Sequence, residues 1–265
     1  MKLETEIPLR RFKTLLVVDL EATCDQPQLF RDEMETIEFG AVLLRMSDYT
    51  VIDKRSWFVR PQVHPALTDY CTRLTSITQS QVDSAMTFDQ VSEEVLAWIA
   101  PHRERLGWGS WGNFDRHQLE KDARRLSIES PLAGIRHTNL KDVFSKKHQT
   151  GKPRPGMQRA LSLCSLEIGG THHRGIDDAR NIARIVPFIL ESTLRPRVQA
   201  NLVKERELRR AGVLHRPDLR IEPMSLEEQR EIERIEAEYR ANPESAMSLD
   251  EAFTYLRKKT PGAST

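Results

Sequence analysis

An apolar run that ends in two acidic residues is the feature that most constrains the fold of this chain. The segment LLVVDLEATC, residues 15–24, is typical of a buried strand and carries Asp19 and Glu21 at its end. Residues two apart on a strand point to the same face, so the two carboxylates lie side by side. Such a pair needs solvation or a neutralising partner, and a divalent cation is one such partner. An isolated D-x-E motif is frequent by chance, so a metal site requires further carboxylates elsewhere.

The composition narrows the class of protein. The 265 residues are enough for one sizeable domain with an appended segment. No apolar run approaches the length of a membrane span and the N-terminus lacks the apolar core of a secretion signal, so we expect no membrane contact. The three cysteines are widely spaced without a C-x-x-C pair, which favours a reducing, cytoplasmic location over a disulfide framework. The net charge of +1 neither requires nor excludes a nucleic acid, so any attraction to phosphates is local.

The hydrophobic pattern predicts strands first and helices later. Residues 14–21, IEFGAVLLRM from Ile37 and KRSWFVRP from Lys54 are typical of strands, and the short polar connection between the last two predicts an antiparallel meander. Strand-like segments then alternate with helical ones. Helix starts are indicated at Thr78, Thr87, Asn113, about Met157 and about Ile176. This order favours an α/β fold with a mixed central sheet flanked by helices.

Two further aspartates open predicted helices. Asp115 and Asp178 each lie in a first turn, where the helix dipole favours a carboxylate, and each begins an apolar stripe at helical spacing. The stripes are Leu119, Ala123 and Leu126 after Asp115, and Ile182, Ile185 and Ile189 after Asp178. Four carboxylates therefore occupy the ends or first turns of elements that face the core.

These motifs resemble those of the DEDDh family of 3′-to-5′ exonucleases, the DnaQ-like branch of the RNase H-like fold. That family carries D-x-E on its first strand, an Asp that opens a middle helix, and H-x(4)-D near the end. The chain shows DLEATC, WGNFDRHQLEKD and HRGIDDARNIA in this order, and the resemblance covers roughly residues 12–192. EATC, WFVRP and LTSIT are closest to the branch of the histone-mRNA 3′ exonuclease and the enhanced-RNA-interference exonucleases. Ser76 stands where members commonly have glycine, which puts the close approach of this loop to a substrate in question.

The resemblance implies a metal-dependent exonuclease that acts on single-stranded nucleic acid. Asp19, Glu21, Asp115 and Asp178 would hold two divalent ions, with Asp19 as the bridging ligand, and oxygen ligands favour Mg²⁺ with Mn²⁺ as a substitute. His173 would accept the proton of the attacking water, and nucleoside 5′-monophosphates would be released. RNA is the expected substrate and DNA a second candidate. The alternatives are a DNA proofreading exonuclease, against which EATC argues modestly, and a non-catalytic nucleic-acid-binding module, against which the complete residue set argues.

The last motif contains two histidine–aspartate pairs of the same spacing. His172 precedes Asp177 as His173 precedes Asp178. We assign the second pair because Asp178 continues the apolar stripe of its helix, whereas Asp177 faces elsewhere. Adjacent histidines are expected to diverge and no other His or Cys pair supports them, so we do not expect a zinc site at THHRG.

Several other residues are candidates for substrate binding. By resemblance, the backbone from Leu20 to Thr23 approaches the terminal sugar and Leu74 lies under the terminal base. Trp111 or Phe114 would stack on a base, with a place in the core as the alternative for both. The segment 144–159 holds five Lys or Arg and no acid, so it is a candidate phosphate contact. The substrate-binding candidates are Leu20, Ala22, Thr23, Leu74, Trp111, Phe114, Lys146, Lys147, Lys152 and Arg154.

The character of the sequence changes after Ser192. We expect residues 1–195 to form the exonuclease domain and residues 196–265 to form a charged helical extension. Ser225 with Glu228 and Ser248 with Glu251 have capping-box spacing. The apolar stripe that follows is too narrow for an independent domain, so the extension is expected to pack on the core, a second copy of the chain or another protein.

Overall fold

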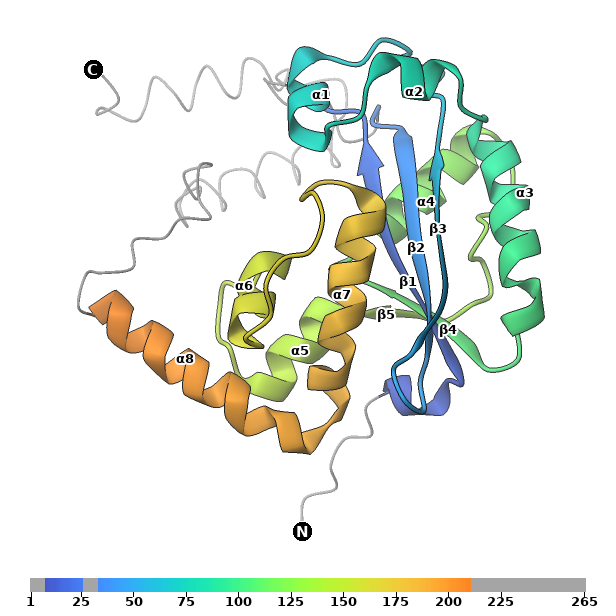
Figure 1. Cartoon of the computed structure of the whole chain (residues 1–265). Coiled ribbons are helices and arrows are strands. Elements are labelled where there is room, and N and C mark those ends of the chain that lie inside the picture. The colour runs from blue at the N-terminus through green and yellow to red at the C-terminus, as the bar shows by residue number, and fades with distance from the viewer. Residues whose placement is uncertain (1–7, 26–32, 211–265) are drawn as a thin grey trace, which may run out of the picture. The chain divides into compact units, whose positions relative to one another are not determined.

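One mixed sheet organises the protein. The structure is a computed structural model that describes residues 8–25 and 33–210. Its five strands lie in the order β3-β2-β1-β4-β5 (Figure 1). They are β1 Thr14–Ala22, β2 Thr36–Arg45, β3 Val51–Phe58, β4 Leu106–Ser110 and β5 His137–Asn139. The pairs β1–β2 and β2–β3 are antiparallel, whereas β1–β4 and β4–β5 are parallel. The predicted mixed sheet, with a meander at its start, is confirmed.

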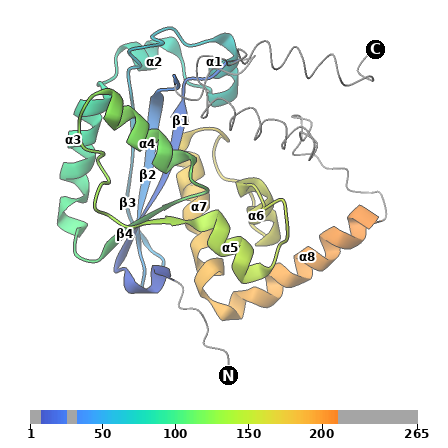
Figure 2. The ribbon, with the colours of Figure 1, turned by 180° about the vertical axis from the view of Figure 1, so that it is seen from behind.

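Helices cover both faces of this sheet. Helices α3 and α4 lie on one face, and α5, α6 and α7 lie on the other (Figures 1 and 2). The helices are η1 Pro8–Arg11, α1 Asp69–Thr75, α2 Gln79–Asp83, α3 Phe88–Ile99, η2 Ala100–His102, α4 Phe114–Arg125, α5 Leu140–His148, α6 Met157–Leu163, α7 Gly175–Leu190, η3 Ser192–Leu194 and α8 Arg195–Arg210. The capping boxes predicted at Thr78 and Thr87 begin α2 and α3. None of the helices in the described part of the chain is long and apolar enough to cross a bilayer.

The alternation of β1 decides which residues can meet. Leu15 and Val17 are buried in the cluster formed with α5, α6 and α7, whereas Leu16 and Val18 are buried in the cluster formed with α3 and α4. Because the side-chain period of a strand is two residues, positions 19 and 21 continue the face of Leu15 and Val17. The fold therefore directs both carboxylates of the first motif toward the face that α7 covers.

Two elements differ from their predicted bounds. The third strand begins at Val51 instead of Lys54, and it is an edge strand whose first residues are mostly exposed. Helix α1 was not predicted, although Thr68 caps it by accepting a hydrogen bond from the Cys71 backbone N–H. Few residues of either segment are buried, so the hydrophobic pattern missed the first residues of β3 and the whole of α1.

The region after Ser192 begins as a helix attached to the core. Helix α8 buries Val198 and Leu202 in the cluster that contains α7. The described residues up to Glu207 belong to one compact unit. The predicted domain boundary at residue 195 stays a prediction, and the helices predicted at Ser225 and Ser248 lie outside the described residues.

Candidate active site

The first and last motifs meet at the end of β1. Helix α7 packs across β1 and β2, and its first turn carries Asp178. One carboxylate oxygen each of Asp19, Glu21 and Asp178 lies within 4.8 Å of the others. The apolar stripe after Asp178 is buried as predicted, with Ile182, Ile185 and Ile189 all in the core. The burial of this stripe orients α7 so that Asp178 faces the carboxylates of β1.

Asp115 joins the group from the opposite face of the sheet. Helix α4 begins just after β4, which runs parallel to β1 and ends at the same edge. The Leu20 backbone N–H donates to Asp115 Oδ1 at 3.0 Å, so this carboxylate is tied directly to β1. All four predicted carboxylates therefore lie at one edge of the sheet.

Burial raises the pKa of three of these carboxylates, and repulsion by neighbouring carboxylates adds to the rise for Asp19 and Glu21. Burial raises the pKa of Asp19 well above its ordinary value, and Asp115, Glu21, Asp178 and Glu38 raise it further. Burial, followed by the charges of Asp178, Glu38 and Asp115, raises the pKa of Glu21 to about 9. Burial raises the pKa of Asp115 to about 6, although hydrogen bonds from the Leu20 backbone and the Ser110 side chain oppose this rise. A divalent cation would reverse this effect, because it stabilises the ionised form of each ligand.

The two oxygens of Asp178 show how such a cation would be held. Oδ2 accepts a hydrogen bond from the His173 backbone N–H at 3.1 Å and lies 2.9 Å from His172 Nδ1. Oδ1 is buried and has no hydrogen-bond partner among the described residues. A buried carboxylate oxygen without a partner is costly unless a ligand binds it. Together with the all-oxygen donors of Asp19 and Glu21, it fits a hard divalent metal ion.

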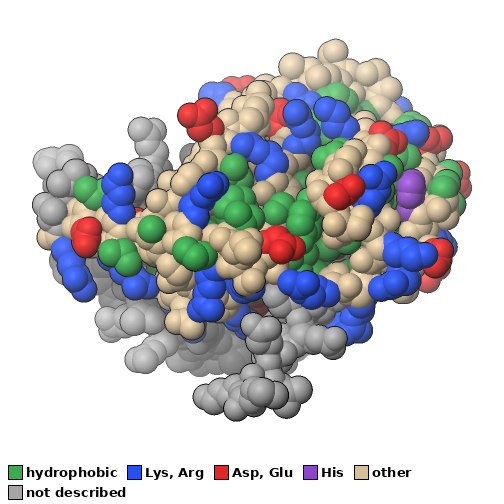
Figure 3. Space-filling model, turned by 60° about the horizontal axis from the view of Figure 1, so that its bottom comes forward, with side chains coloured by type: hydrophobic (Ala, Val, Ile, Leu, Met, Phe, Trp, Pro, Cys, Tyr) green, Lys and Arg blue, Asp and Glu red, His purple; other side chains and the backbone are tan. Residues whose placement is uncertain are grey.

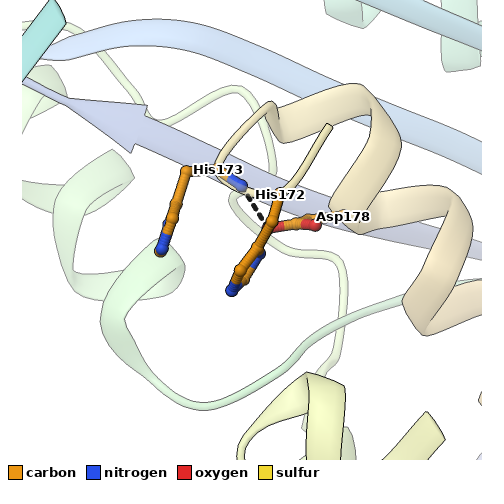
Figure 4. A group of neighbouring side chains, drawn as sticks. All are labelled: His172, His173 and Asp178. Atoms are coloured by element: carbon orange, nitrogen blue, oxygen red, sulfur yellow. Dashed lines mark hydrogen bonds and ion pairs between the residues drawn. The ribbon is translucent and has the colours of Figure 1, made fainter. Parts of the chain in front are cut away.

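The two histidines before α7 lie parallel rather than apart (Figure 4). Their ring centroids are 3.9 Å apart with an interplanar angle of 18°. His173 has φ 63°, in the left-handed region, and this turn of the backbone aligns the two side chains. The expectation that adjacent histidines diverge is therefore wrong. Burial lowers the pKa of His173, as does His172, while Asp178 opposes this change, so His173 is neutral at pH 7 and able to accept a proton.

Sequence reasoning missed a buried residue that positions α7. Glu38 is fully buried on β2, directly opposite Glu21 in the sheet. Its Oε2 accepts hydrogen bonds from Arg174 Nε and from the Gly175 backbone N–H, both at 3.0 Å, and its Oε1 accepts one from Ser56 at 2.7 Å. Glu38 thus anchors the first residue of α7 to the sheet. A carboxylate inside an otherwise apolar strand segment, IEFGAVLL, was the signal that could have identified it.

Close packing of glycines completes this anchor. A Cβ at Gly40 would lie 2.0 Å from the carbonyl carbon of Gly175, and one at Gly175 would lie 2.8 Å from the backbone oxygen of Asp19. Only glycine at both positions lets the start of α7 contact the backbone of β1 and β2. This contact sets the spacing between Asp178 and the carboxylates of β1.

The predicted sugar contacts lie at the same edge as the carboxylates. Leu20, Ala22 and Thr23 belong to or directly follow the last part of β1, and their side chains are buried. Leu74 is half-buried on α1, the short helix that ends at Ser76. Ser76 has φ 60°, a left-handed conformation that favours glycine, which gives the physical reason for the glycine of the resembling family.

The two aromatic candidates have different environments. Trp111 Nε1 donates to the Pro155 carbonyl at 3.1 Å, and the indole ring lies 5.7 Å from that of Phe144. Phe114 is 44% exposed beside Asp115. The Phe114 ring is therefore the one free to stack on a base, whereas Trp111 is held by the core.

The predicted basic contacts are spread over α5 and the loop after it. Lys146 and Lys147 lie in the last turn of α5. That helix starts where β5 ends, at the edge of the carboxylates, so Lys146 and Lys147 lie about 9 to 11 Å from its first residue along the helix axis. Lys152 is exposed, and Arg154 is paired with Asp142 at 2.8 Å. Arg154 is thereby held at the first turn of α5, and the phosphate-contact role of these four side chains stays a prediction.

A hollow lies at the opposite end of the sheet. Its volume is about 610 Å³, and its lining includes Arg10, Lys13, Arg45 and Arg105. Lys13 is paired with Glu104, and Arg45 with Asp48. Figure 3 shows the lower end of the molecule, where Lys and Arg side chains are dispersed with acidic ones between them. The chemistry of the candidate site lies elsewhere, at the edge where β1 ends.

Known proteins carry the same fold and motifs. The sequence profile of the exonuclease family matches residues 16–186. The 3′-5′ exonuclease eri1 of Schizosaccharomyces pombe is 33% identical over 203 residues, which cover 65% of this chain and 66% of that protein. The human ERI1 exoribonuclease 3 is 33% identical over 204 residues, which cover 71% of this chain and 59% of the relative. The chain thus spans about 55 to 66% of the length of such relatives.

A solved structure confirms the architecture. The nuclease domain of 3′hExo, a DEDDh family member bound to rAMP, aligns with a TM-score of 0.65 and 27% identity, over 69% of this chain and 94% of that domain. The chain belongs to the exonuclease family, and within it to the DEDDh 3′-5′ exonucleases with their RNase H-like fold. This family depends on divalent metal ions, and the acidic side chains at the end of β1 are placed to bind them. The family membership that the three motifs predicted is confirmed.

Proposed function

We propose that this protein is a 3′-5′ exonuclease that hydrolyses single-stranded RNA and releases nucleoside 5′-monophosphates. The observation that carries the proposal is the convergence of Asp19, Glu21 and Asp178 within 4.8 Å, with Asp115 bonded to the same strand. Mg²⁺ is the proposed cofactor, as two ions held by these carboxylates, and Mn²⁺ is the substitute. Relatives named exoribonucleases, and a neighbour bound to rAMP, support RNA as the substrate.

The residues of the chain divide the work of hydrolysis. When bound, two divalent ions supply activation of the attacking water and charge stabilisation for the leaving 3′ oxygen. Asp19, Glu21, Asp115 and Asp178 hold them. His173 accepts the proton of the attacking water through its neutral imidazole ring. The end of β1 positions the terminal sugar, and the exposed ring of Phe114 stacks on a base.

Two alternatives make different demands on the substrate. A DNA proofreading enzyme would prefer DNA, and a non-catalytic binding module would retain the strand uncut. The first receives little support because curated relatives are named for RNA. The binding module receives little support because all four carboxylates and His173 are present and lie near one another.

One experiment separates these functions. RNA and DNA oligonucleotides of the same sequence, labelled at the 5′ end, are incubated with the full chain and Mg²⁺ or EDTA and resolved over time. We expect a ladder that shortens from the 3′ end, faster for RNA, with 5′-monophosphates found by chromatography. A circular RNA serves as the control and remains intact. Its cleavage would indicate an endonuclease, faster digestion of DNA would favour proofreading, and binding without products would favour the binding module.

The two segments of the chain are each proposed to have a role. Residues 1–195 are proposed as the exonuclease domain, acting in the cytoplasm in RNA processing. Residues 196–265 are proposed as a helical extension that contacts a second copy of the chain or another protein. The burial of Val198 and Leu202 against the core supports a packing role for the beginning of this extension.

A further inference from the structure

A second group of potential metal ligands shares one residue with the carboxylate site. Ligand atoms of His172, His173 and Asp178 lie within 4.8 Å of one another (Figure 4). The set has two imidazole nitrogens and one carboxylate oxygen, so its chemistry differs from that of the all-oxygen group formed by Asp19, Glu21 and Asp178. Imidazole suits zinc and related transition metals, whereas oxygen donors suit magnesium and manganese.

The backbone presents these donors together. The left-handed conformation of His173 places the two rings side by side, and both are half-buried. The ring of His173 makes no hydrogen bond to other described residues, and Asp178 Oδ1 has no partner there either. Two of the three donor groups therefore have an unused ligand atom, and the third, His172, contacts Asp178 at 2.9 Å.

The two rings must leave their parallel arrangement to share one ion. Ligands of a tetrahedral zinc ion, with bonds of about 2.0 to 2.2 Å, lie about 3.4 Å from each other. The present donors already lie within 4.8 Å of one another, but the lone pair of each imidazole nitrogen lies in its ring plane, so binding requires the two near-parallel rings to rotate about their side-chain bonds. The fourth position remains for water, as in zinc sites with three protein ligands.

We infer that His172, His173 and Asp178 form a binding site for Zn²⁺ or a similar transition-metal ion, and that its occupation inhibits the enzyme. Inhibition follows because the ion engages His173, the proposed general base, and Asp178, a proposed ligand of the catalytic metal. This second part rests on the proposed function, whereas binding itself does not. The site makes hydrolysis sensitive to the ratio of Zn²⁺ to Mg²⁺.

Direct binding tests the site without relying on hydrolysis. The full chain is titrated with Zn²⁺ against a chromophoric chelator in the absence of Mg²⁺. His172→Asn is the informative variant, because an amide N–H can still donate to Asp178 while the imidazole ligand is lost. We expect its Zn²⁺ affinity to fall at least tenfold, since altering even the supporting residues of a metal site costs about 10 to 100-fold. His102→Asn, on η2 at the far end of β4, is the matched control and retains wild-type affinity.

Asp19→Asn distinguishes Zn²⁺ binding at the histidines from binding among the carboxylates of β1, because this variant leaves both histidines in place. The proposal requires this variant to keep its Zn²⁺ affinity. Equal affinity in His172→Asn and wild type, or loss of binding only in Asp19→Asn, would overturn it by locating Zn²⁺ among the carboxylates or elsewhere. Circular dichroism and thermal melting establish that each variant is folded, and His172→Gln provides a second substitution if His172→Asn is not.

The activity measurement then tests inhibition. RNA hydrolysis at saturating Mg²⁺ is followed over a Zn²⁺ series, and we expect the inhibitory concentration for His172→Asn to rise at least tenfold over that of wild type. If wild type binds Zn²⁺ through His172 yet hydrolyses RNA at full rate, the inhibitory part is wrong. If no variant hydrolyses RNA under any condition, the proposed function fails while the binding result still stands.

Discussion

Asp178 shows at the scale of one residue how a ligand is prepared for a metal. Protein donors occupy its Oδ2, whereas its buried Oδ1 is left without a partner in the described structure. Hydrogen bonds to one oxygen fix the orientation of the other, as in many metal sites. The same residue links the carboxylates of β1 to the histidines before α7.

Removal of one carboxylate tests the metal site. We expect Asp19→Asn and Asp178→Asn each to lower kcat on RNA by at least about a thousandfold, since metal-bound charge stabilisation supplies several kcal/mol at the transition state. EDTA should have the same effect, reversed by Mg²⁺. Single-turnover kinetics and thermal melting measure the rate and the fold. Full activity in either folded variant contradicts the assignment.

The two histidines test the assignment of the general base. His173→Ala should reduce kcat by about 10² to 10⁴-fold with little change in RNA affinity, because general-base catalysis contributes this much. His172→Ala should reduce kcat much less, since it removes only a hydrogen bond to Asp178. Rates at saturating RNA and fluorescence anisotropy with Ca²⁺ separate turnover from binding. The opposite order of the two variants would show that the last motif is aligned one residue out of register.

The buried carboxylates predict an unusual pH dependence of stability in the absence of metal. Glu21 has an ordinary pKa of 4.5 and a pKa of about 9 in the folded protein. Between these values the folded state holds a proton that the unfolded state has released, so the free energy of unfolding falls as pH rises. One such carboxyl contributes at most about 1.4 kcal/mol per pH unit.

Chemical denaturation from pH 5 to 8 in EDTA measures this slope. Glu21→Gln should make the slope shallower, and Mg²⁺ should remove most of it because the ion favours the ionised carboxylate. A slope that is unchanged in Glu21→Gln would show that other groups set the pH dependence.

Single residues also show where sequence reasoning ends. Asp19, Glu21, Asp115 and Asp178 were predictable because each begins or ends an element with a clear apolar period. Glu38 was not, because its partner Arg174 is 136 positions away and only the folded sheet brings them together. The parallel histidine rings were also missed, since they depend on one positive φ angle.

Among the elements, α7 is the one whose position is fixed by close backbone contact with the sheet. Gly40→Ala would place a Cβ 2.0 Å from the backbone of Gly175, so the helix has to move. We expect a loss of stability of about 1 to 3 kcal/mol, as for other overpacked sites, and a fall in kcat because Asp178 moves with α7. Denaturation and kinetics measure the two effects.

A matched glycine controls for the substitution itself. Gly156→Ala introduces a Cβ that meets no atom within 4 Å, so stability and kcat should remain near wild type. Wild-type behaviour of Gly40→Ala would mean that the contact between α7 and β2 does not position the site.

Element types were more predictable than element limits. The apolar periods of α3, α4 and α7 identified each helix, whereas the exposed edge strand β3 and the short helix α1 present too few buried positions for a period to appear. The roles of Lys146 and Lys147 could not be decided from the sequence for a related reason. Nearness in sequence to the last motif does not give the direction in which α5 leaves the sheet, so their contact with phosphates stays a prediction.

At the scale of the whole molecule, α8 links the core to the region after it. Val198 and Leu202 are buried in the core, and Arg159 pairs with Glu205. A chain that ends at residue 195 should still cleave a short oligonucleotide in a metal-dependent manner, because every motif residue precedes that point. Its stability should fall by about 3 to 6 kcal/mol through the loss of two buried aliphatic side chains.

A chain that ends at residue 210 is the control and should keep both stability and cleavage. Denaturation and oligonucleotide cleavage compare the two truncated chains with the full one. Loss of all cleavage in a shorter chain that is demonstrably folded would show that residues beyond 195 supply part of the active site.

The two halves of the candidate site are made at different times during protein synthesis. About 160 residues separate Asp19 from Asp178, and a ribosome adding about 5 to 20 residues per second needs roughly 8 to 30 s to pass between them. During this interval the nascent chain has neither its last carboxylate nor His173, although the messenger RNA lies close by. Hydrolytic capacity arises only once α7 has emerged and packed on the sheet. Under the proposed function, the order of the motifs thus keeps the nascent chain from hydrolysing RNA until α7 has been made.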